Sequence, residues 1–425
     1  MPVFDEATAT ARRQRAEQAL GANAPILVVG AGEPIGVPGG LDRTYPFLAH
    51  PEYYWLTGAR RAGGVVVFEP GAGWTHFVRP ASAEERLWEG EPDVPEGEDL
   101  AKFEAWAKAR AGRKIAALGV PPKEVAADPA STAAAQVALD AARRPKDDAE
   151  IALLRRAAAA TAAGYARLPE WIRPGVTERR IQVELEAEFY RAGCDGVGYG
   201  TIVGAGTHAA VLHFEPGDRV VGEDDVVLID AGGHVAQYTS DVTRTFHAKG
   251  RLNPQQKAIY DVVLAAEVEG IGLCTIGREW HDVHRACARV LAQGLKDLGL
   301  LRGEVDGLLE SEAITCFFPH GIGHMVGLYV RDVGGRAPGR EEGRKCCGTK
   351  VRVDLPLGEH FVMTVEPGIY FVPAILDDPE RRKRFPDAVA WDAAERWRPV
   401  GGVRIEDNIL VTRSGPENLT AAIPK

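Results

Sequence analysis

The chain has 425 residues, of which 45% are hydrophobic and 26% charged, as in an ordinary globular protein. Because single cores stop growing near roughly 250–300 residues, this length predicts two domains. The net charge of -10 argues against nucleic acid as a partner, since no basic surplus exists to neutralise phosphates. No apolar run approaches the ~18 residues of a membrane span, and the polar N-terminus lacks a signal peptide's apolar stretch. We therefore expect a cytoplasmic protein without a membrane partner.

The first part of the chain is predicted to be a small α/β domain covering residues 1–144. Residues 26–29 and 65–68 are apolar runs bounded by glycine and proline, which is typical of buried strands. Ala-rich sequence of helical character fills much of 100–142. The polar, proline-broken stretch 143–148 then predicts a boundary, with a second domain over 145–425.

An early glycine-rich turn resembles a dinucleotide-binding loop. Residues 28–36 read VVGAGEPIG, with the spacing G-x-G-x-x-x-G rather than G-x-G-x-x-G. A helix should follow to hold the pyrophosphate, but Pro34 and Pro38 forbid one. The sequence therefore favours a strand and a turn over an NAD-dependent dehydrogenase.

The second domain is predicted to be α+β. A helix is expected from about 148 to 168, and Thr177 is the expected N-cap of another that ends at Gly193. Asn253 followed by Pro254 indicates the start of a third helix. Short strands are expected at 226–230, 235–238 and 242–246. This pattern predicts helices covering one face of a curved, mostly antiparallel sheet.

Six cysteines do not make a disulfide framework in a chain of this length. Cys346 and Cys347 are adjacent in a Lys/Arg/Gly-rich loop, with no third and fourth metal ligand near them in the sequence. We predict plain surface thiols there rather than a metal or redox centre.

Five segments of the second domain each offer a residue that can bind a metal ion. They read LIDAGG (228–233), SDVTRTF (240–246), HGIGH (320–324), TVEPG (364–368) and GGVRIED (401–407). Asp230 ends one expected strand and Asp241 precedes another, so a hairpin-like return would bring both carboxylates together. Taken singly, an Asp before Gly-Gly or a Glu before Pro-Gly is usually a turn residue, and His324 also fits a core histidine. Spacing alone does not prove that the five residues converge.

Together, and in this order, the five segments resemble the ligand motifs of the prolidase and aminopeptidase P branch of the pita-bread metallopeptidases. The resemblance covers residues 148–425 and implies a C-terminal pita-bread fold. It implies two divalent metal ions, with Asp241 and Glu406 bridging them. Asp230 would complete one metal, and His324 and Glu366 the other.

Elementary electrostatics agrees with this assignment. Four carboxylates within ~4 Å would repel by several kcal/mol per pair at an effective dielectric of about 20, and two divalent ions would balance their charge. Oxygen ligands with one imidazole suit Mn²⁺ best, and Zn²⁺, Co²⁺ or Fe²⁺ also fit. The expected nucleophile is a hydroxide bridging the two metals, with Glu366 as general base.

The same resemblance assigns substrate-side roles and a reaction. His213, His320 and Tyr199 match residues near the substrate, and Arg404 matches an arginine behind the metals. The implied reaction is cleavage of the bond before proline, a tertiary amide whose ring nitrogen must be protonated as it leaves. The N-terminal domain resembles the family more weakly, through YPF (45–47) and YWLTG (54–58). In relatives this domain makes a homodimer and forms an edge of the substrate site.

Two features favour a prolidase, which cuts Xaa-Pro dipeptides. About 30 residues separate Tyr370 from Gly401, like the prolidase insertion, and Arg352 lies where prolidases bind the substrate carboxylate. Arg331 departs from the family, which usually has a histidine there, and leaves the substrate preference open. Aminopeptidase P, acting on longer peptides, is the alternative, followed by a pita-bread binding protein without catalysis.

Overall fold

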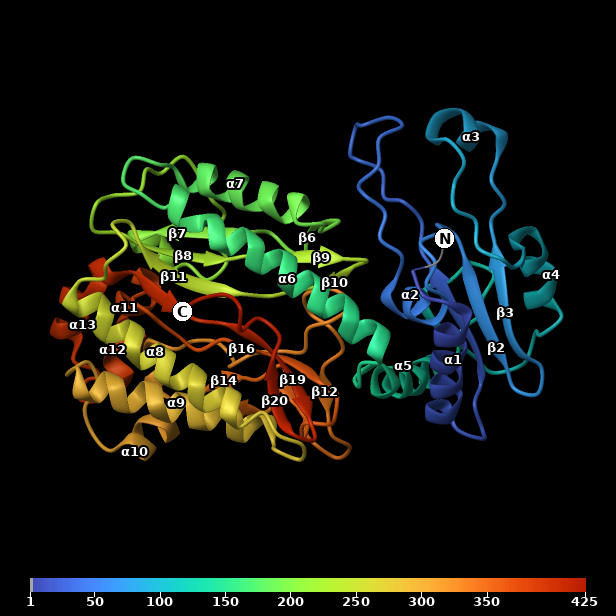
Figure 1. Cartoon of the computed structure of the whole chain (residues 1–425). Helices are drawn as coiled ribbons and strands as arrows, with labels where there is room; N and C mark the ends of the chain where they lie inside the picture. Colours follow the sequence, from blue (N-terminus) through green and yellow to red (C-terminus); the bar gives the residue numbers. More distant parts are fainter. Residues whose placement is uncertain (1–2) are drawn as a thin grey trace. The chain divides into compact units, whose positions relative to one another are not determined.

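The computed structural model describes residues 3–425 as two compact units, one ending at Arg144 and the other comprising Pro145–Lys425 (Figure 1). Among these residues, no helix combines the length and the apolar character that crossing a membrane requires.

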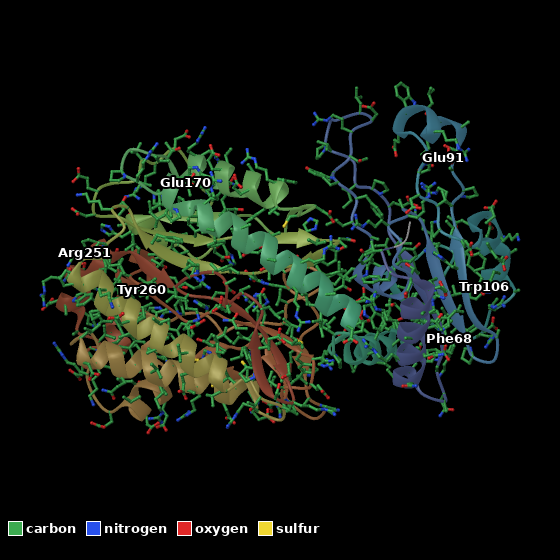
Figure 2. All side chains as sticks on the ribbon, in the orientation of Figure 1. Phe68, Glu91, Trp106, Glu170, Arg251 and Tyr260 are labelled. Carbon is green, nitrogen blue, oxygen red and sulfur yellow. The ribbon has the colours of Figure 1, made fainter. Side chains whose placement is uncertain are left out.

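The N-terminal unit is a five-stranded sheet in the order β4-β3-β2-β1-β5, flanked by helices. The strands are β1 (Ile26–Ala31), β2 (Val65–Glu69), β3 (Gly73–Val78), β4 (Glu98–Asp99) and β5 (Ile115–Val120). The helices are α1 (Glu6–Leu20), α2 (Pro51–Thr57), α3 (Ala83–Glu89), α4 (Phe103–Lys108) and α5 (Pro129–Arg143). Phe68 on β2 and Trp106 on α4 are labelled in this unit (Figure 2), and Trp106 stacks on Phe103 with ring centroids 5.6 Å apart.

Two N-terminal details bear on the sequence predictions. The helical prediction for 100–142 holds at α4 and α5 but is wrong at β5, because pairing with β1 overrides the helix propensity of its alanines. Gly30, in the turn that resembles a dinucleotide-binding loop, is required for packing: a Cβ there would lie 2.0 Å from the carbonyl oxygen of Val120. Close packing against Val120 therefore accounts for Gly30 without a bound nucleotide.

The C-terminal unit combines long helices with short, mostly antiparallel strands. Its helices are α6 (Asp148–Trp171), α7 (Glu178–Arg191), α8 (Pro254–Gly272), α9 (Trp280–Asp297), α10 (Val305–Glu310), α11 (Pro373–Leu376), α12 (Pro379–Arg384) and α13 (Trp391–Trp397). Its strands are β6 (Gly196–Val197), β7 (Ile202–Ala205), β8 (Val226–Asp230), β9 (Gly233–Val235), β10 (Tyr238–Thr239), β11 (Thr243–His247), β12 (Gly335–Arg336), β13 (Lys345–Cys346), β14 (Thr349–Lys350), β15 (Val353–Asp354), β16 (Val362–Val365), β17 (Gly368–Tyr370), β18 (Gly402–Arg404), β19 (Asp407–Thr412) and β20 (Gly415–Asn418). In Figure 1, α6 and α7 lie along β7, β8 and β11, whereas α8 and α9 lie on the other side of the unit.

Capping explains where two of these helices begin. The side chain of Thr177 accepts a hydrogen bond from the backbone N–H of Arg180, which confirms the predicted N-cap of α7. Asn253 and Gln256 cap each other at the start of α8, with Pro254 in the first turn. Both helices then bury one apolar face.

The strand expected at 235–238 is wrong. Instead β9 and β10 pair as a hairpin, with Val235 opposite Tyr238. Ala236 and Gln237 form the turn in the left-handed conformation, with φ of 51° and 70°. The sequence does not predict this turn, because neither residue is glycine.

Strand register brings distant segments together. β8 pairs antiparallel with β11, so that Asp230 lies opposite Thr243, and Thr243 forms a bridge with Glu406. β16 pairs with β19, which places Val365 opposite Asp407. These pairings bring together the end of β8, the segment before β11, the segment after β16 and the link between β18 and β19.

Candidate active site

The five predicted metal ligands line one cavity of about 790 Å³ in the C-terminal unit. One ligand atom each from Asp241, His324 and Glu406 lies within 4.8 Å of the others. His324 Nε2 lies 3.4 Å from Asp241 Oδ2 and 3.8 Å from Glu366 Oε1. Asp230 stands at the end of β8 in the same cavity wall.

The protonation of His324 suits a metal ligand. Its Nδ1 lies 2.9 Å from the carbonyl oxygen of Met325, a group that can only accept, so Nδ1 carries the proton. Nε2 is therefore the ring nitrogen that could bind a metal ion, and it faces the carboxylates of Asp241 and Glu366. The backbone N–H of His324 donates to Thr364 Oγ1 at 3.0 Å, which fixes the segment against β16.

The carboxylates repel one another inside the protein. Burial raises the pKa of Asp230, Glu366 and Glu406, and the charge of Asp241 adds to the rise in all three. Burial alone would lower the pKa of His324, but the hydrogen bond to Asp241 and the charge of Glu366 raise it. Such a cluster of buried oxygens with one imidazole can hold divalent cations, which would relieve this repulsion.

Arg404 ties several of these residues into one network. It donates from Nη2 to Asp230 Oδ2 at 2.6 Å, from Nε to Thr243 Oγ1 at 3.0 Å and from Nη1 to the Tyr370 hydroxyl at 3.0 Å. The Thr243 hydroxyl in turn donates to Glu406 Oε2 at 2.6 Å. Sequence reasoning missed Thr243 and Tyr370, because a threonine in a strand and a tyrosine after a turn carry no signal of their own.

Tyr370 extends the network to His320. Its hydroxyl lies 2.8 Å from His320 Nε2, and His320 Nδ1 donates to the carbonyl oxygen of Gly321 at 2.9 Å. Since Tyr370 accepts from Arg404, its own proton is free for His320 Nε2. Burial, together with the charge of Arg404, lowers the pKa of His320 to about 3, so its imidazole is neutral.

The remaining predicted residues also line the cavity. The Tyr199 hydroxyl donates to Asp230 Oδ1 at 2.7 Å. Burial lowers the pKa of His213, and the charge of Arg331 lowers it further. Arg331 and Arg352 are exposed in the cavity wall, and within residues 3–425 neither forms an ion pair. Asp332, which follows Arg331 in the sequence, pairs with the buried Lys146 at 2.9 Å.

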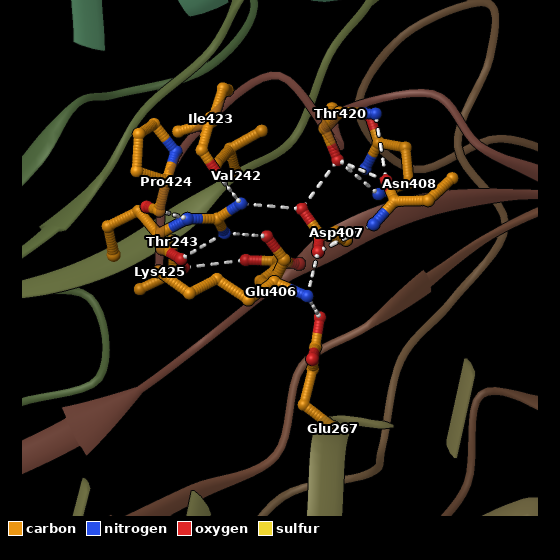
Figure 3. Close-up of polar contacts among 12 residues, drawn as sticks. Val242, Thr243, Glu267, Glu406, Asp407, Asn408, Thr420, Ile423, Pro424 and Lys425 are labelled. Atoms are coloured by element: carbon orange, nitrogen blue, oxygen red, sulfur yellow. Dashed lines mark hydrogen bonds and ion pairs between the residues drawn. The ribbon is translucent and has the colours of Figure 1, made fainter. Parts of the chain in front are cut away.

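A second polar network surrounds Glu406 and Asp407 (Figure 3). Arg244 Nη2 donates to Asp407 Oδ1 at 2.7 Å, and its Nη1 donates to the carbonyl oxygen of Glu406 at 2.7 Å. Asn408 exchanges two hydrogen bonds with the backbone of Asp241, at 2.9 and 2.6 Å. The main chains that carry two candidate ligands are therefore fixed by fully buried polar groups.

Comparison with known proteins identifies the family. Residues 152–413 match "Metallopeptidase family M24". The chain belongs to metallopeptidase family M24. Residues 9–106 of this M24 protein match "Aminopeptidase P, N-terminal domain". The predicted fold, a pita-bread domain following a smaller α/β domain, is thereby confirmed.

Several relatives of this M24 chain carry the name of one enzyme. It is 31% identical over 405 residues to "Probable Xaa-Pro aminopeptidase pepP" of Botryotinia fuckeliana, covering 90% of this chain and 86% of that protein. The structure of Pseudomonas aeruginosa aminopeptidase PepP superposes with a TM-score of 0.81 and 29% identity, covering 100% of this chain and 97% of that one. Escherichia coli aminopeptidase P in complex with substrate gives a TM-score of 0.81 and 27% identity, covering 99% and 96%. These relatives favour aminopeptidase P over the prolidase that the sequence suggested.

Proposed function

We propose that this chain is a metal-dependent Xaa-Pro aminopeptidase, which removes the first residue of peptides whose second residue is proline. The observation that carries the proposal is one cavity whose lining includes the four predicted carboxylate ligands, His324, His320 and Arg404. The names of its M24 relatives support the substrate class. Homodimer formation through the N-terminal unit stays a prediction.

Asp230, Asp241, His324, Glu366 and Glu406 would hold the two divalent ions. When bound, these ions would polarise the scissile carbonyl and lower the pKa of a water molecule. The donor set suits Mn²⁺, with Zn²⁺ or Co²⁺ as alternatives. Escherichia coli aminopeptidase P has been described with zinc substituted and product bound.

The chain's own residues would hold the substrate and move protons. Glu366, whose pKa is raised, accepts the proton of the attacking water and returns it to the proline nitrogen. Neutral His320 takes part as a hydrogen-bonding group rather than a charge. Tyr199 and Arg404 each bind one oxygen of Asp230 and so fix its orientation.

The charge of the cavity wall also supports short peptides, including Xaa-Pro dipeptides, as proposed substrates. Five carboxylates and four guanidinium groups line the cavity. With two divalent ions bound, positive charge exceeds negative charge in the wall. Because Arg331 and Arg352 are exposed and form no ion pair within the part of the chain that the structure describes, they are available to a substrate carboxylate.

The test is hydrolysis of Ala-Pro-Ala, Ala-Pro and Ala-Ala-Ala by protein reloaded with Mn²⁺. We expect both proline peptides to be cut and Ala-Ala-Ala to be spared. Glu406→Gln should be inactive, whereas Glu417→Gln, at an exposed glutamate paired with Arg155, should match the wild type. Cleavage of Ala-Pro alone would indicate a prolidase. Cleavage of neither proline peptide would refute both the aminopeptidase P and the prolidase assignments.

A further inference from the structure

Two adjacent cysteines occupy the tip of a hairpin outside the catalytic cavity. Cys346 ends β13, and Cys347 and Gly348 form the turn to β14 with φ of 50° and 84°. The two Sγ atoms lie 3.9 Å apart. This left-handed turn folds the second thiol back towards the first.

Their surroundings differ from those of the other cysteines. Both thiols are partly exposed, whereas Cys194 and Cys274 are buried and burial raises the pKa of their thiols to about 11 and about 12. Contact with the Cys346 thiol lowers the pKa of Cys347 against the effect of partial burial, and the charge of Arg285 on α9 lowers it further. Cys347 is therefore the better nucleophile of the pair.

A buried histidine adjoins the pair, which the sequence did not indicate. One ring nitrogen of His284 lies within 4.8 Å of both sulfurs. His284 Nδ1 accepts the backbone N–H of Ile322 at 3.1 Å, so its other nitrogen, Nε2, carries the proton of the neutral ring. A protonated nitrogen is not a metal ligand, and the two thiols would be left without a third donor. The arrangement favours dithiol chemistry over a metal site.

We propose that Cys346 and Cys347 are a redox-active dithiol that forms an internal disulfide by exchange with a low-molecular-weight disulfide such as glutathione disulfide. The Cys347 thiolate attacks one sulfur of that disulfide and releases one glutathione thiolate. The Cys346 thiol then attacks the mixed disulfide at Cys347 and releases the second glutathione. One external disulfide is reduced to two thiols while the two protein thiols are oxidised.

The pair is connected to the catalytic cavity by two short routes. Ile322, which donates to His284, lies between His320 and His324, and the ring of Phe318 packs on both His284 and His320 with centroids 5.4 and 4.9 Å apart. Closing the sulfurs from 3.9 Å to a bond of about 2.05 Å must move the hairpin tip.

The second route is the chain itself. β14 ends at Lys350, and Arg352 follows two residues later in the cavity wall. Displacement of this hairpin therefore reaches both the histidine segment and a guanidinium in the cavity wall. We expect the disulfide to lower peptidase activity; this part rests on the proposed function.

The experiment treats the full-length protein with glutathione disulfide and measures peptide masses and peptidase activity. The peptide with both cysteines should lose two hydrogens while the four buried thiols stay reduced. The kcat/KM for Ala-Pro-Ala should fall about tenfold or more and recover with dithiothreitol. Cys347→Ser, which lies outside the catalytic machinery, should keep its activity through the same treatment.

The two parts of the proposal fail separately. A mass that never shows the internal disulfide, or a lasting mixed disulfide with glutathione, would overturn the dithiol assignment. A disulfide that leaves kcat/KM unchanged would overturn the connection to the cavity. Because the mass readout needs no turnover, absence of peptidase activity before treatment would count against the proposed function alone.

Discussion

Replacing Arg244 by methionine should destabilise the C-terminal unit by about 3–5 kcal/mol, the usual effect of removing one partner of a buried ion pair. Arg244 is 1% exposed and Asp407 0%. Besides that pair, the guanidinium donates to the carbonyl oxygens of Thr243, Glu406, Ile423 and Pro424, at 2.7 to 2.9 Å. Methionine fills similar space but leaves four carbonyl groups without this donor. It also leaves Lys425 as the one cation shared by the buried carboxylates of Asp407 and Glu267, at 2.7 and 2.6 Å, among the residues that the structure describes.

Urea denaturation of the Arg244→Met variant, followed by tryptophan fluorescence, measures this change. Since domains are commonly stable by about 5–15 kcal/mol, the variant should still fold. Its affinity for Mn²⁺ should also fall, because the backbone of Glu406 loses a hydrogen bond. Arg251→Met is the matched control: Arg251 is exposed, is labelled in Figure 2, and should change stability by no more than about 0.5 kcal/mol.

A second substitution separates the ion pair from the packing. Asp407→Asn in the Arg244→Met background removes the excess negative charge beside Lys425 and Glu267 and should recover part of the lost stability. If Arg244→Met costs no more than Arg251→Met, the buried pair does not support the site. If Asp407→Asn adds its own full cost, the two residues act independently.

The remaining predictions concern metal, substrate length and pH. Asp241→Asn should lose metal content as well as rate, and full turnover after chelation in the wild type would contradict metal dependence. Arg352→Ala should raise KM for Ala-Pro more than for Ala-Pro-Ala; an equal rise would show that the arginine does not bind the dipeptide carboxylate. Arg331→His should reduce the preference for Ala-Pro over its C-terminal amide, and an unchanged ratio would exclude that contact. Burial lowers the pKa of His284 to about 4, so the unfolded chain binds its proton first as pH falls from about 6.5 towards 4. Urea midpoints should decrease over that interval, less steeply in His284→Phe, and equal slopes in both proteins would refute this reasoning.

Local signals in the sequence were enough for part of the fold. Thr177 and the Asn253-Pro254 pair announce helix starts by capping chemistry, which depends on neighbours within one turn. β5 contains alanines, which favour a helix, but it forms a strand because it pairs with β1. The paired residues Ile26 and Ile115 are 89 positions apart in the sequence. The residues of β5 alone therefore do not predict this pairing.

The candidate site likewise contains residues that the sequence predicts and residues that it does not. The five acidic and histidine residues stand in recognisable motifs, so their convergence was predictable, and their roles stay predictions. Thr243, Tyr370 and Arg244 were missed because their importance comes from partners far along the chain. The proximity of His284 to Cys346 was missed for the same reason, since 62 residues separate them in the sequence.

The bridge between Thr243 and Glu406 has a consequence for biosynthesis. A ribosome must translate 176 residues beyond Asp230 before Glu406 exists, and β18 and β19 must then dock against β11. Until that step, the carboxylates belong to separate pieces of an incomplete sheet, and long-range closures of this kind form late. A nascent or truncated chain would thus bind divalent ions poorly and cut no peptides, so proteolytic capacity would appear only once the C-terminal unit has closed.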